Sequence, residues 1–333
     1  MILSERKIPK ELLYFRALEK RLDLSLAQKK KLSTLEKGYI GELLYDSIYD
    51  EVLSHLYVFR DIYIKIDDST LQCDTLIVSD AGFIVNEIKN YQGIYTYENE
   101  KWYVRKNEIS ENPIIQMKRT TSKLIQLKYL YNENFETDGK VIFPNSEFAL
   151  DTKHPTAWDY IVMRQELRRY FYSLCDLEVG KRTVDLSKII QEHIVDNPYF
   201  KQSTNFSKLK KGLYCRSCSS FDLKKIKFHF RCEQCGHKDT VHTLMIQALA
   251  DYNILFNDGY ISRKKLSEFL AGAVGHSTLS KYLNKYSRRI DKGRTTKYKF
   301  NYYDFEDALK NEHRLWRYYD MPLPDKVNTI VRM

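Results

Sequence analysis

The sequence predicts an α/β protein in which helices flank a mixed sheet, followed by two smaller modules. Three observations support this. Apolar, β-branched runs separated by turn residues alternate with long helical patterns in the first half of the chain. Two Cys-x-x-C pairs come next. Short helical patterns separated by glycines occupy the rest of the chain, which predicts a helical C-terminal region.

The composition is that of a folded protein with a surplus of basic residues. The 333 residues are 43% hydrophobic and 29% charged, which is typical of globular domains and sufficient for two or more cores. The formal net charge of +10 favours polyanionic partners, nucleic acid above all. No run of eighteen apolar residues and no apolar leader core occurs, so we expect a cytoplasmic protein without membrane contact.

The predicted elements of the main domain follow one another as helix, strands, helix and strand. A helix is expected at Glu36–Leu56. Apolar residues recur there every four positions, at Ile40, Leu44, Ile48 and Val52. Strands are expected at Tyr57–Ile66, Leu71–Ser79, Phe83–Lys89, Ile94–Glu98, Trp102–Arg105 and Val141–Phe143. A second helix, Pro113–Tyr131, begins with a proline suited to a first helical turn, and this mixed order predicts an α/β sheet with one covered edge.

We divide the chain into five parts on these patterns. Helical patterns at Trp158–Leu174 and Leu186–Val195 make the third part a partly helical connector. The parts are a helical segment at 1–35, the main α/β domain at 36–150, the connector at 151–210, the cysteine module at 211–238 and a helical region at 239–333.

Charged residues interrupt the apolar strands of a predicted hairpin. If its turn centres on residues 80–81, Asp74 lies opposite Glu87 across the ladder. Glu87 and Lys89 share one face, because side chains alternate along a strand. Two acids on neighbouring strands can hold a hard divalent cation, while the lysine orients a water or neutralises charge. The alternative is that these residues form the solvated face of an amphipathic hairpin.

The order of short motifs in this region resembles a known family. The motifs are Gly38-Tyr-Ile-Gly-Glu42, Asp74, Glu87-Ile-Lys89 and Asn112-Pro-Ile-Ile-Gln116. Together they resemble the NERD (nuclease-related) domain over roughly residues 36–150. That family resembles the PD-(D/E)xK nucleases, whose core is a mixed sheet flanked by helices.

The resemblance implies roles for five residues. Asp74 and Glu87 would be ligands of a catalytic Mg²⁺ or Mn²⁺, and Lys89 the catalytic lysine. Glu42 would be the helix-borne acid that completes or supports the metal site. Gln116 would be the polar residue of the following helix that faces it. Without the resemblance, solvent exposure is the ordinary interpretation of Glu42 and Gln116.

Four of the six cysteines predict a second metal site. They lie in two knuckles, Cys215-Arg-Ser-Cys218 and Cys232-Glu-Gln-Cys235, with room for a β-hairpin between them. This spacing is typical of a zinc ribbon, in which four thiolates hold a structural Zn²⁺ and leave no open position for chemistry. A pair of disulfides is the alternative, and a reducing cytosol disfavours it.

The C-terminal helical patterns suggest a helix-turn-helix. They cover His242–Phe256, Ser262–Leu270 and His276–Tyr286, with Ser277–Lys285 as the recognition helix. Lys281–Lys299 has eight basic residues and one acid, and its second half can form a basic wing. The predicted nucleic-acid contacts are Lys281, Lys285, Arg288, Arg289 and Arg294. The alternative is a small helical bundle with a solvated basic face.

These observations predict a metal-dependent nuclease that hydrolyses phosphodiester bonds by water attack. DNA is favoured over RNA, because the family resembles restriction and repair nucleases. A non-catalytic nucleic-acid-binding protein built on a nuclease-like scaffold is the main alternative. An adaptor for protein interactions, whose basic charge is incidental, is the third, although the sequence identifies no protein partner.

Overall fold

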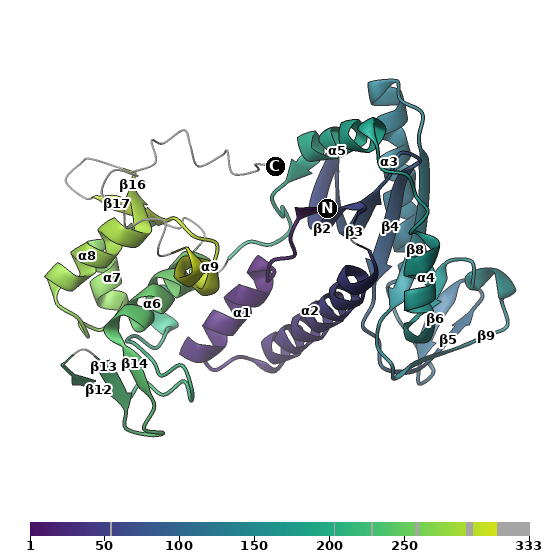
Figure 1. Ribbon diagram of the computed structural model, residues 1–333. Coiled ribbons are helices and arrows are strands. Elements are labelled where there is room, and N and C mark those ends of the chain that lie inside the picture. Colours follow the sequence, from purple (N-terminus) through teal and green to yellow (C-terminus); the bar gives the residue numbers. More distant parts are fainter. Residues whose placement is uncertain (54, 203, 228, 257–259, 291–295, 312–333) are drawn as a thin grey trace. The chain divides into compact units, whose positions relative to one another are not determined.

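The main sheet of the chain is mixed and has the strand order β1-β2-β3-β4-β8-β10, with β11 paired to β2 (Figure 1). Their bounds are Ile2–Ser4 for β1, Tyr57–Ile66 for β2, Ser69–Val78 for β3, Gly82–Ile88 for β4, Glu136–Phe143 for β8, Ile161–Met163 for β10 and Ile194–Val195 for β11. β2, β3 and β4 are antiparallel neighbours. The parallel pairs are β1 with β2, β8 with β4 and β10 with β8. The fold is therefore mixed α/β, as the sequence predicts.

This computed structural model describes residues 1–311 except 54, 203, 228, 257–259 and 291–295. The chain divides into two units. Unit 1 consists of Met1–Pro9 and Lys30–Phe200. Unit 2 consists of Lys10–Lys29 and the described part of Lys201–Met333. The main sheet belongs to unit 1, and the cysteine module belongs to unit 2.

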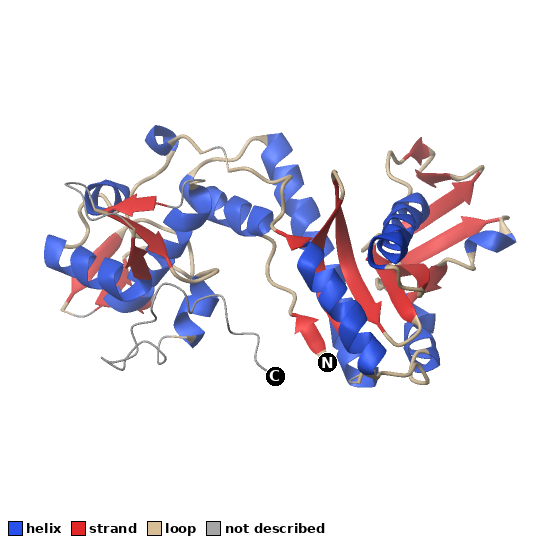
Figure 2. Cartoon of the chain, turned by 90° about the horizontal axis from the view of Figure 1, so that it is seen from above, coloured by secondary structure: helices blue, strands red, loops and turns tan. Residues whose placement is uncertain are grey.

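Helices cover both faces of the main sheet, so its strands are apolar on both sides. The bounds are Leu26–Val52 for α2, Pro113–Tyr131 for α3, Leu167–Ser173 for α4 and Lys181–His193 for α5. One core joins α2 and α4 to the sheet through Tyr45 and Phe171. The other core joins α3 and α5 to the opposite face through Leu127 and Ile190. Figure 2 shows helices on both sides of these strands.

A smaller sheet extends unit 1 beside the end of β4. Its order is β7-β6-β5-β9. The bounds are Gly93–Glu98 for β5, Lys101–Val104 for β6, Asn107–Glu108 for β7 and Phe148–Thr152 for β9. Trp102 and Phe148 of this sheet are buried in the same core as α3. The small sheet is thus part of the folded unit and follows directly on the segment that carries Lys89.

Unit 2 combines a ribbon with a winged arrangement of helices. The ribbon strands are β12 (Leu223–Ile226), β13 (His229–Cys232) and β14 (Lys238–Thr240). The following elements are α6 (Val241–Leu255), β15 (Tyr260–Ser262), α7 (Arg263–Phe269), α8 (His276–Tyr286), β16 (Ser287–Arg289), β17 (Lys297–Phe300) and α9 (Phe305–Lys310). β15, β17 and β16 pair in that order. The three short strands show that this region is not made of helices alone, and its assignment as a winged helix-turn-helix stays a prediction.

A buried ion pair anchors α1 (Lys10–Arg21) within unit 2. Arg21 is 2% exposed, and its Nη2 lies 3.1 Å from Asp251 Oδ2 on α6. Arg21 Nη1 donates to the carbonyl of Gly212, and the Tyr214 hydroxyl donates to the same Asp251 oxygen at 3.0 Å. Because both charges find partners, the pair links α1, the entry to the ribbon and α6 at one point.

The predicted helix Trp158–Leu174 is wrong in its first half. Residues Ile161–Met163 instead form β10, which pairs in parallel with β8 at the edge of the main sheet. The helix α4 begins only at Leu167. The β-branched residues Ile161 and Val162 explain the difference, because an open sheet edge gives them a better packing partner than a helix surface does.

The predicted apolar stripe of the first long helix is confirmed at three of its four positions. α2 begins at Leu26 and not at Glu36. Leu44, Ile48 and Val52 pack in the core on the sheet, whereas Ile40 is 56% exposed. Tyr45 and Tyr49, which the four-residue ladder does not include, are buried in the same core. Glu42, one turn before Tyr45, is half-buried.

None of the helices among the described residues is both long enough and apolar enough to cross a membrane.

Candidate active site and zinc site

The hairpin between β3 and β4 brings the two predicted strand acids together. Its turn is closed by paired hydrogen bonds between Ser79 and Gly82 of 3.0 and 3.1 Å, so the turn centres on residues 80–81 as predicted. Thr75 pairs with Asn86, and the same register places Asp74 opposite Glu87. The backbone N–H of Ile88 donates to Asp74 Oδ2 at 2.8 Å, which fixes the Asp74 carboxylate against β4.

Both acids are buried. Asp74 is 8% exposed and Glu87 is 1% exposed, so the hairpin face that carries them is not a solvated surface. The Lys89 ammonium lies 2.9 Å from Glu87 Oε1 in an ion pair. Burial and the charge of Asp74 raise the pKa of Glu87 to about 8, although Lys89 opposes the shift. Burial and the like charge of Asp74 both oppose the ionised form of Glu87, and a bound cation would offset that cost.

Glu42 reaches the same place from α2 through a close helix–strand contact. A Cβ built on Gly41 would lie 2.3 Å from Asn90 Cβ, so only glycine lets the helix approach the end of β4 this closely. The Asn90 side chain donates to the Lys37 carbonyl at 2.7 Å and fastens the contact. Burial and the charge of Asp74 raise the pKa of Glu42 to about 8, against the opposing effect of Arg6.

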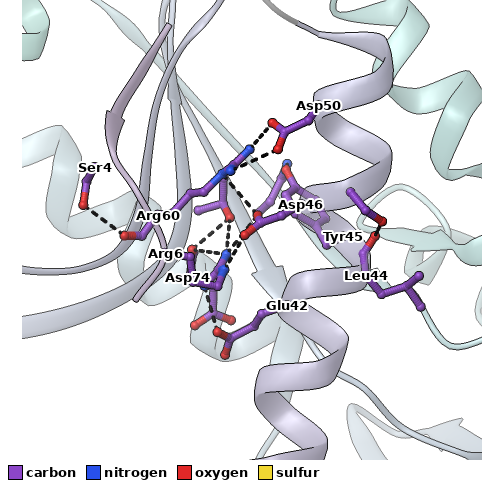
Figure 3. Close-up of polar contacts among 12 residues, drawn as sticks. Ser4, Arg6, Glu42, Leu44, Tyr45, Asp46, Asp50, Arg60 and Asp74 are labelled. Atoms are coloured by element: carbon purple, nitrogen blue, oxygen red, sulfur yellow. Dashed lines mark hydrogen bonds and ion pairs between the residues drawn. The ribbon is translucent and has the colours of Figure 1, made fainter. Parts of the chain in front are cut away.

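A buried arginine from the N-terminal segment joins these acids (Figure 3). Arg6 Nη1 donates to Glu42 Oε2 at 2.8 Å, and Arg6 Nε donates to Asp46 Oδ2 at 2.7 Å. Its Nη2 donates to the Asp74 carbonyl at 3.0 Å and to Thr75 Oγ1 at 3.1 Å. Only 2% of the Arg6 side chain is exposed. One guanidinium therefore ties α2 to β3 at the candidate site.

Each of the three acids uses one carboxylate oxygen in a contact with the protein. These contacts are Arg6 to Glu42 Oε2, the Ile88 N–H to Asp74 Oδ2, and Lys89 to Glu87 Oε1. Among the described residues, no hydrogen bond is formed to the second oxygen of any of the three. A carboxylate oxygen left open on each acid suits a hard divalent cation, but among the described residues only the four cysteines form a group whose ligand atoms already lie close enough together to hold an ion.

Gln116 lies near the start of α3 and is half-buried. The side chain of Asn112 caps this helix by accepting from the N–H groups of Ile114 and Ile115. Within the described residues, no hydrogen bond joins the Gln116 side chain to Glu42, Asp74 or Glu87. The structure therefore brings four of the five predicted residues into one interacting group, and the role of Gln116 stays a prediction.

Asp61 is an acid of this region that sequence reasoning missed. It lies on β2 between the pairs Arg60–Thr75 and Ile62–Cys73, which places it across the ladder from Asp74. Its φ of 47° lies in the left-handed region that residues other than glycine rarely adopt. Burial and the charge of Asp74 raise its pKa. Neither a motif nor a periodicity marks Asp61 in the sequence.

Arg6 was also missed. It stands among charged neighbours in Glu5-Arg-Lys7, inside the segment 1–35 for which only helices were predicted. Its closest partners in the sequence, Glu42 and Asp46, are 36 and 40 residues away. The acids Glu42, Asp46 and Asp50 are spaced four residues apart and therefore lie on one face of α2. This spacing is the one signal in the sequence that a buried basic residue packs against that face.

The four cysteines form a compact cluster. Their sulfur atoms all lie within 4.8 Å of one another. Cys215 and Cys235 sulfurs are 3.6 Å apart, and Cys218 and Cys232 sulfurs are 3.5 Å apart. Four thiolates at about 2.3 Å from a tetrahedral zinc would lie roughly 3.8 Å apart, close to what is observed. The cluster can therefore hold a zinc ion.

The two knuckles have the same backbone geometry. The N–H of Ser219 donates to the Cys215 carbonyl at 2.9 Å, and the N–H of Gly236 donates to the Cys232 carbonyl at 2.9 Å. Ser219 and Gly236 have φ values of 62° and 74°. Each knuckle is thus a tight turn that ends in a left-handed residue, which points both of its thiolates to one side.

The predicted nucleic-acid contacts among the described residues lie on α8 and β16. Lys281 is exposed and Lys285 is half-buried on α8, with its Nζ 5.0 Å from the centroid of the Tyr286 ring. Arg288 and Arg289 are exposed on β16. Arg289 Nη2 donates to Thr296 Oγ1 at 2.9 Å. Arg294 lies outside the described residues.

Comparison with known families gives one match. Residues 37–144 match the family model described as "NERD: Nuclease-related domain". No curated protein and no solved structure matches the chain. The match runs from residue 37 of α2 through the end of β8, including α3. It therefore includes Glu42, Asp74, Glu87, Lys89 and Gln116. Arg6 and the cysteine cluster lie outside it, so the similarity to the NERD, nuclease-related, domain concerns residues 37–144.

Proposed function

We propose that this chain is a metal-dependent nuclease that hydrolyses phosphodiester bonds, with DNA favoured over RNA. The observation that carries the proposal is the group formed by Glu42, Asp74, Glu87 and Lys89 inside the segment that matches a nuclease-related family. Three buried or half-buried acids with one lysine have little structural use, because apolar residues would stabilise this position more.

Asp74 and Glu87 would hold the Mg²⁺ or Mn²⁺, and Glu42 would complete or support the site. The bound ion would lower the pKa of a coordinated water and stabilise charge that develops on the phosphate. Lys89, held by Glu87, would position that water or help to deprotonate it. For Lys89, burial opposes the charged form, yet Glu87 and Asp74 raise its pKa, so it acts first as a positive charge. Gln116 would contribute a polar contact from α3.

Unit 2 would hold the polyanion. One face of the ribbon presents a row of cations, because Lys224 pairs with Arg231 and Arg231 pairs with Lys238 across the three strands. All three are exposed, and within the described residues none forms an ion pair with an acid. Like charges directly opposite one another on a sheet repel, and phosphate groups offset that repulsion. Two exposed acids, Asp222 and Glu233, lie just beyond the row toward the knuckles.

The winged helix-turn-helix supplies the second surface for nucleic acid. α8 would be the recognition helix, with Lys281 and Lys285 on it and Arg288 and Arg289 on β16. Arg294, outside the described residues, stays a proposed contact. Contacts of this kind position the duplex through its phosphates more than they read bases. The zinc-holding thiolates suit a reducing compartment, so the cytoplasm remains the proposed location.

A cleavage assay tests the proposal directly. Purified chain is incubated with plasmid, single-stranded DNA and RNA, each with Mg²⁺, with Mn²⁺ and with a chelator. Cleavage that requires the metal and is lost in Glu87→Ala supports the proposal. Equal cleavage by parent and variant points to a contaminating nuclease and removes the assignment.

A non-catalytic nucleic-acid-binding protein is the second candidate. The winged arrangement and the cationic ribbon face favour it, because both belong to unit 2 and neither needs the acids of unit 1. The same assay separates the two functions. Duplex binding without cleavage by any tested metal would establish the second candidate.

A further inference from the structure

The N-terminal segment contributes a residue to a site that otherwise belongs to residues 37–144. β1 pairs in parallel with β2, with Ile2 opposite Val58 and Ser4 opposite Phe59. The Ser4 hydroxyl donates to the Arg60 carbonyl at 3.3 Å. These contacts fix the backbone at Ser4, two residues before Arg6. The Arg6 guanidinium therefore reaches the space between α2 and β3 from a backbone that is anchored on the sheet.

We infer that Arg6 is a positioning residue of the metal site, which orients the Glu42 carboxylate and the Asp74 backbone for the ion. This inference rests on the proposed metal-dependent activity and names a residue beyond the family match. The guanidinium holds Glu42 Oε2 at 2.8 Å and leaves Oε1 for a ligand. It also holds the Asp74 carbonyl at 3.0 Å, which restrains the residue whose side chain faces Glu87.

Arg6 has the positive charge and the planar donor group that this positioning role requires. Burial opposes the charged form, but the hydrogen bond with Asp46 and the charges of Glu42 and Asp74 raise its pKa, so it stays protonated. A planar guanidinium can donate to several acceptors in fixed directions, which a lysine cannot do. Outer contacts that orient metal ligands typically change affinity or activity by about 10- to 100-fold when removed.

Arg60 provides a matched control in the same network. Its Nε lies 3.2 Å from Asp46 Oδ1, and its terminal nitrogens bind Asp50. Arg60 is 5% exposed, so its loss disturbs a buried ion pair much as the loss of Arg6 does. The two arginines share Asp46, but only Arg6 contacts Glu42 and the Asp74 carbonyl.

The experiment measures Mn²⁺ binding calorimetrically and cleavage as a function of Mg²⁺ in the full-length, zinc-loaded chain. Arg6→Ala should weaken Mn²⁺ binding and raise the half-saturating Mg²⁺ by about 10-fold or more, and Arg6→Lys should fall between parent and Arg6→Ala. Arg60→Ala should lower thermal stability comparably while changing Mn²⁺ affinity less than about 3-fold. In Glu42→Ala, the further change Arg6→Ala should have little effect on Mn²⁺ affinity, because its partner is gone.

Two results overturn the inference. One is an equal loss of Mn²⁺ affinity in Arg6→Ala and Arg60→Ala, which assigns the effect to folding. The other is full additivity of Arg6→Ala with Glu42→Ala. The proposed function fails separately: a chain that binds Mn²⁺ and shows the Arg6 effect but cleaves no nucleic acid keeps the positioning role and loses the nuclease assignment.

Discussion

The cysteine cluster of unit 2 and the acidic cluster of unit 1 are both candidate metal sites, and they are built in different ways. The four cysteines come from two similar turns that a short hairpin connects, and their sulfurs already lie within 4.8 Å of one another. The acids come from α2, β3 and β4, and they rely on Arg6, Ile88 and Lys89 for their orientation.

The difference between the two clusters matches the role proposed for each ion, structural for zinc and catalytic for magnesium. A structural zinc supplies folding free energy to a module too small to fold on its own core, so its ligands must be close in the sequence. A catalytic Mg²⁺ needs oxygen ligands with open positions for water and phosphate, and a large folded domain can hold these from distant segments. Removing zinc should therefore unfold a region, whereas changing an acid should abolish chemistry in a folded domain.

The largest expected effect is the loss of zinc. Cys232→Ser should reduce the zinc content from about one ion per chain to near zero, and the ribbon should lose its protection from hydrogen exchange. The apparent binding free energy of such sites is about 10–16 kcal/mol, so the ribbon should not fold without the ion. Unit 1 should keep its exchange protection.

Cys175→Ser is the control for this experiment, because Cys175 is a free, exposed cysteine outside the cluster. It should keep both the zinc and the folded ribbon. Elemental analysis that finds no zinc in the parent chain would remove the site.

The next effect concerns catalysis. Glu87→Ala and Lys89→Ala should each lower metal-dependent cleavage by ~100-fold or more, about 2.7 kcal/mol of transition-state stabilisation at 1.36 kcal/mol per factor of ten. Melting curves of both variants should remain cooperative, since neither side chain fills an apolar core.

A second ion pair serves as the matched control. Lys101 Nζ lies 3.0 Å from Glu108 Oε2 at an exposed position of the small sheet. Glu108→Ala and Lys101→Ala should leave cleavage within about a factor of two, because an exposed pair of this kind contributes little to stability. Comparable losses from both pairs would mean that any charge change in unit 1 impairs cleavage.

The predicted nucleic-acid contacts after α8 should show a smaller effect, which concerns duplex binding and not cleavage. Neutralising Arg288, Arg289 and Arg294 together should flatten the log–log dependence of duplex affinity on salt by about 3, because each phosphate contact contributes roughly 0.9. Affinities for two unrelated duplexes should change alike, since phosphate contacts carry no base information. Titrations at several salt concentrations without added Mg²⁺ or Mn²⁺ measure both quantities.

Three exposed cations of α5 provide the comparison for that triple variant. Neutralising Lys181, Arg182 and Lys188 removes the same charge from unit 1. This control variant should keep the parent's salt slope. An unchanged salt slope in the Arg288/Arg289/Arg294 variant would show that these three arginines do not contact nucleic acid.

The smallest effect tests the ribbon face. Arg231→Gln should flatten the salt slope by about 1, whereas Lys225→Gln should change it little, because the two residues point to opposite faces of the same hairpin. Zinc content should stay the same in both variants. If Lys225→Gln has the larger effect, the cation row is not the surface that contacts the phosphates.

The sequence by itself determined the features that depend on neighbours along the chain. The cysteine knuckles, the two-residue turn and the register of Asp74 opposite Glu87 all follow from spacings of a few residues. α3 and α8 begin and end at the predicted residues, 113–131 and 276–286. Local turn chemistry and periodicity decide such features before any long-range contact forms.

Only the tertiary structure decided which charged residues are buried together. Arg6 contacts the Asp74 carbonyl across 68 residues, and Asp61 lies opposite Asp74 without any motif to mark it. Tyr45 and Tyr49 of α2, which the apolar periodicity does not mark, pack against Phe171 of α4, an element far along the chain. A buried ion pair gives no periodic signal, since charged residues look alike in a sequence whether they meet water or each other.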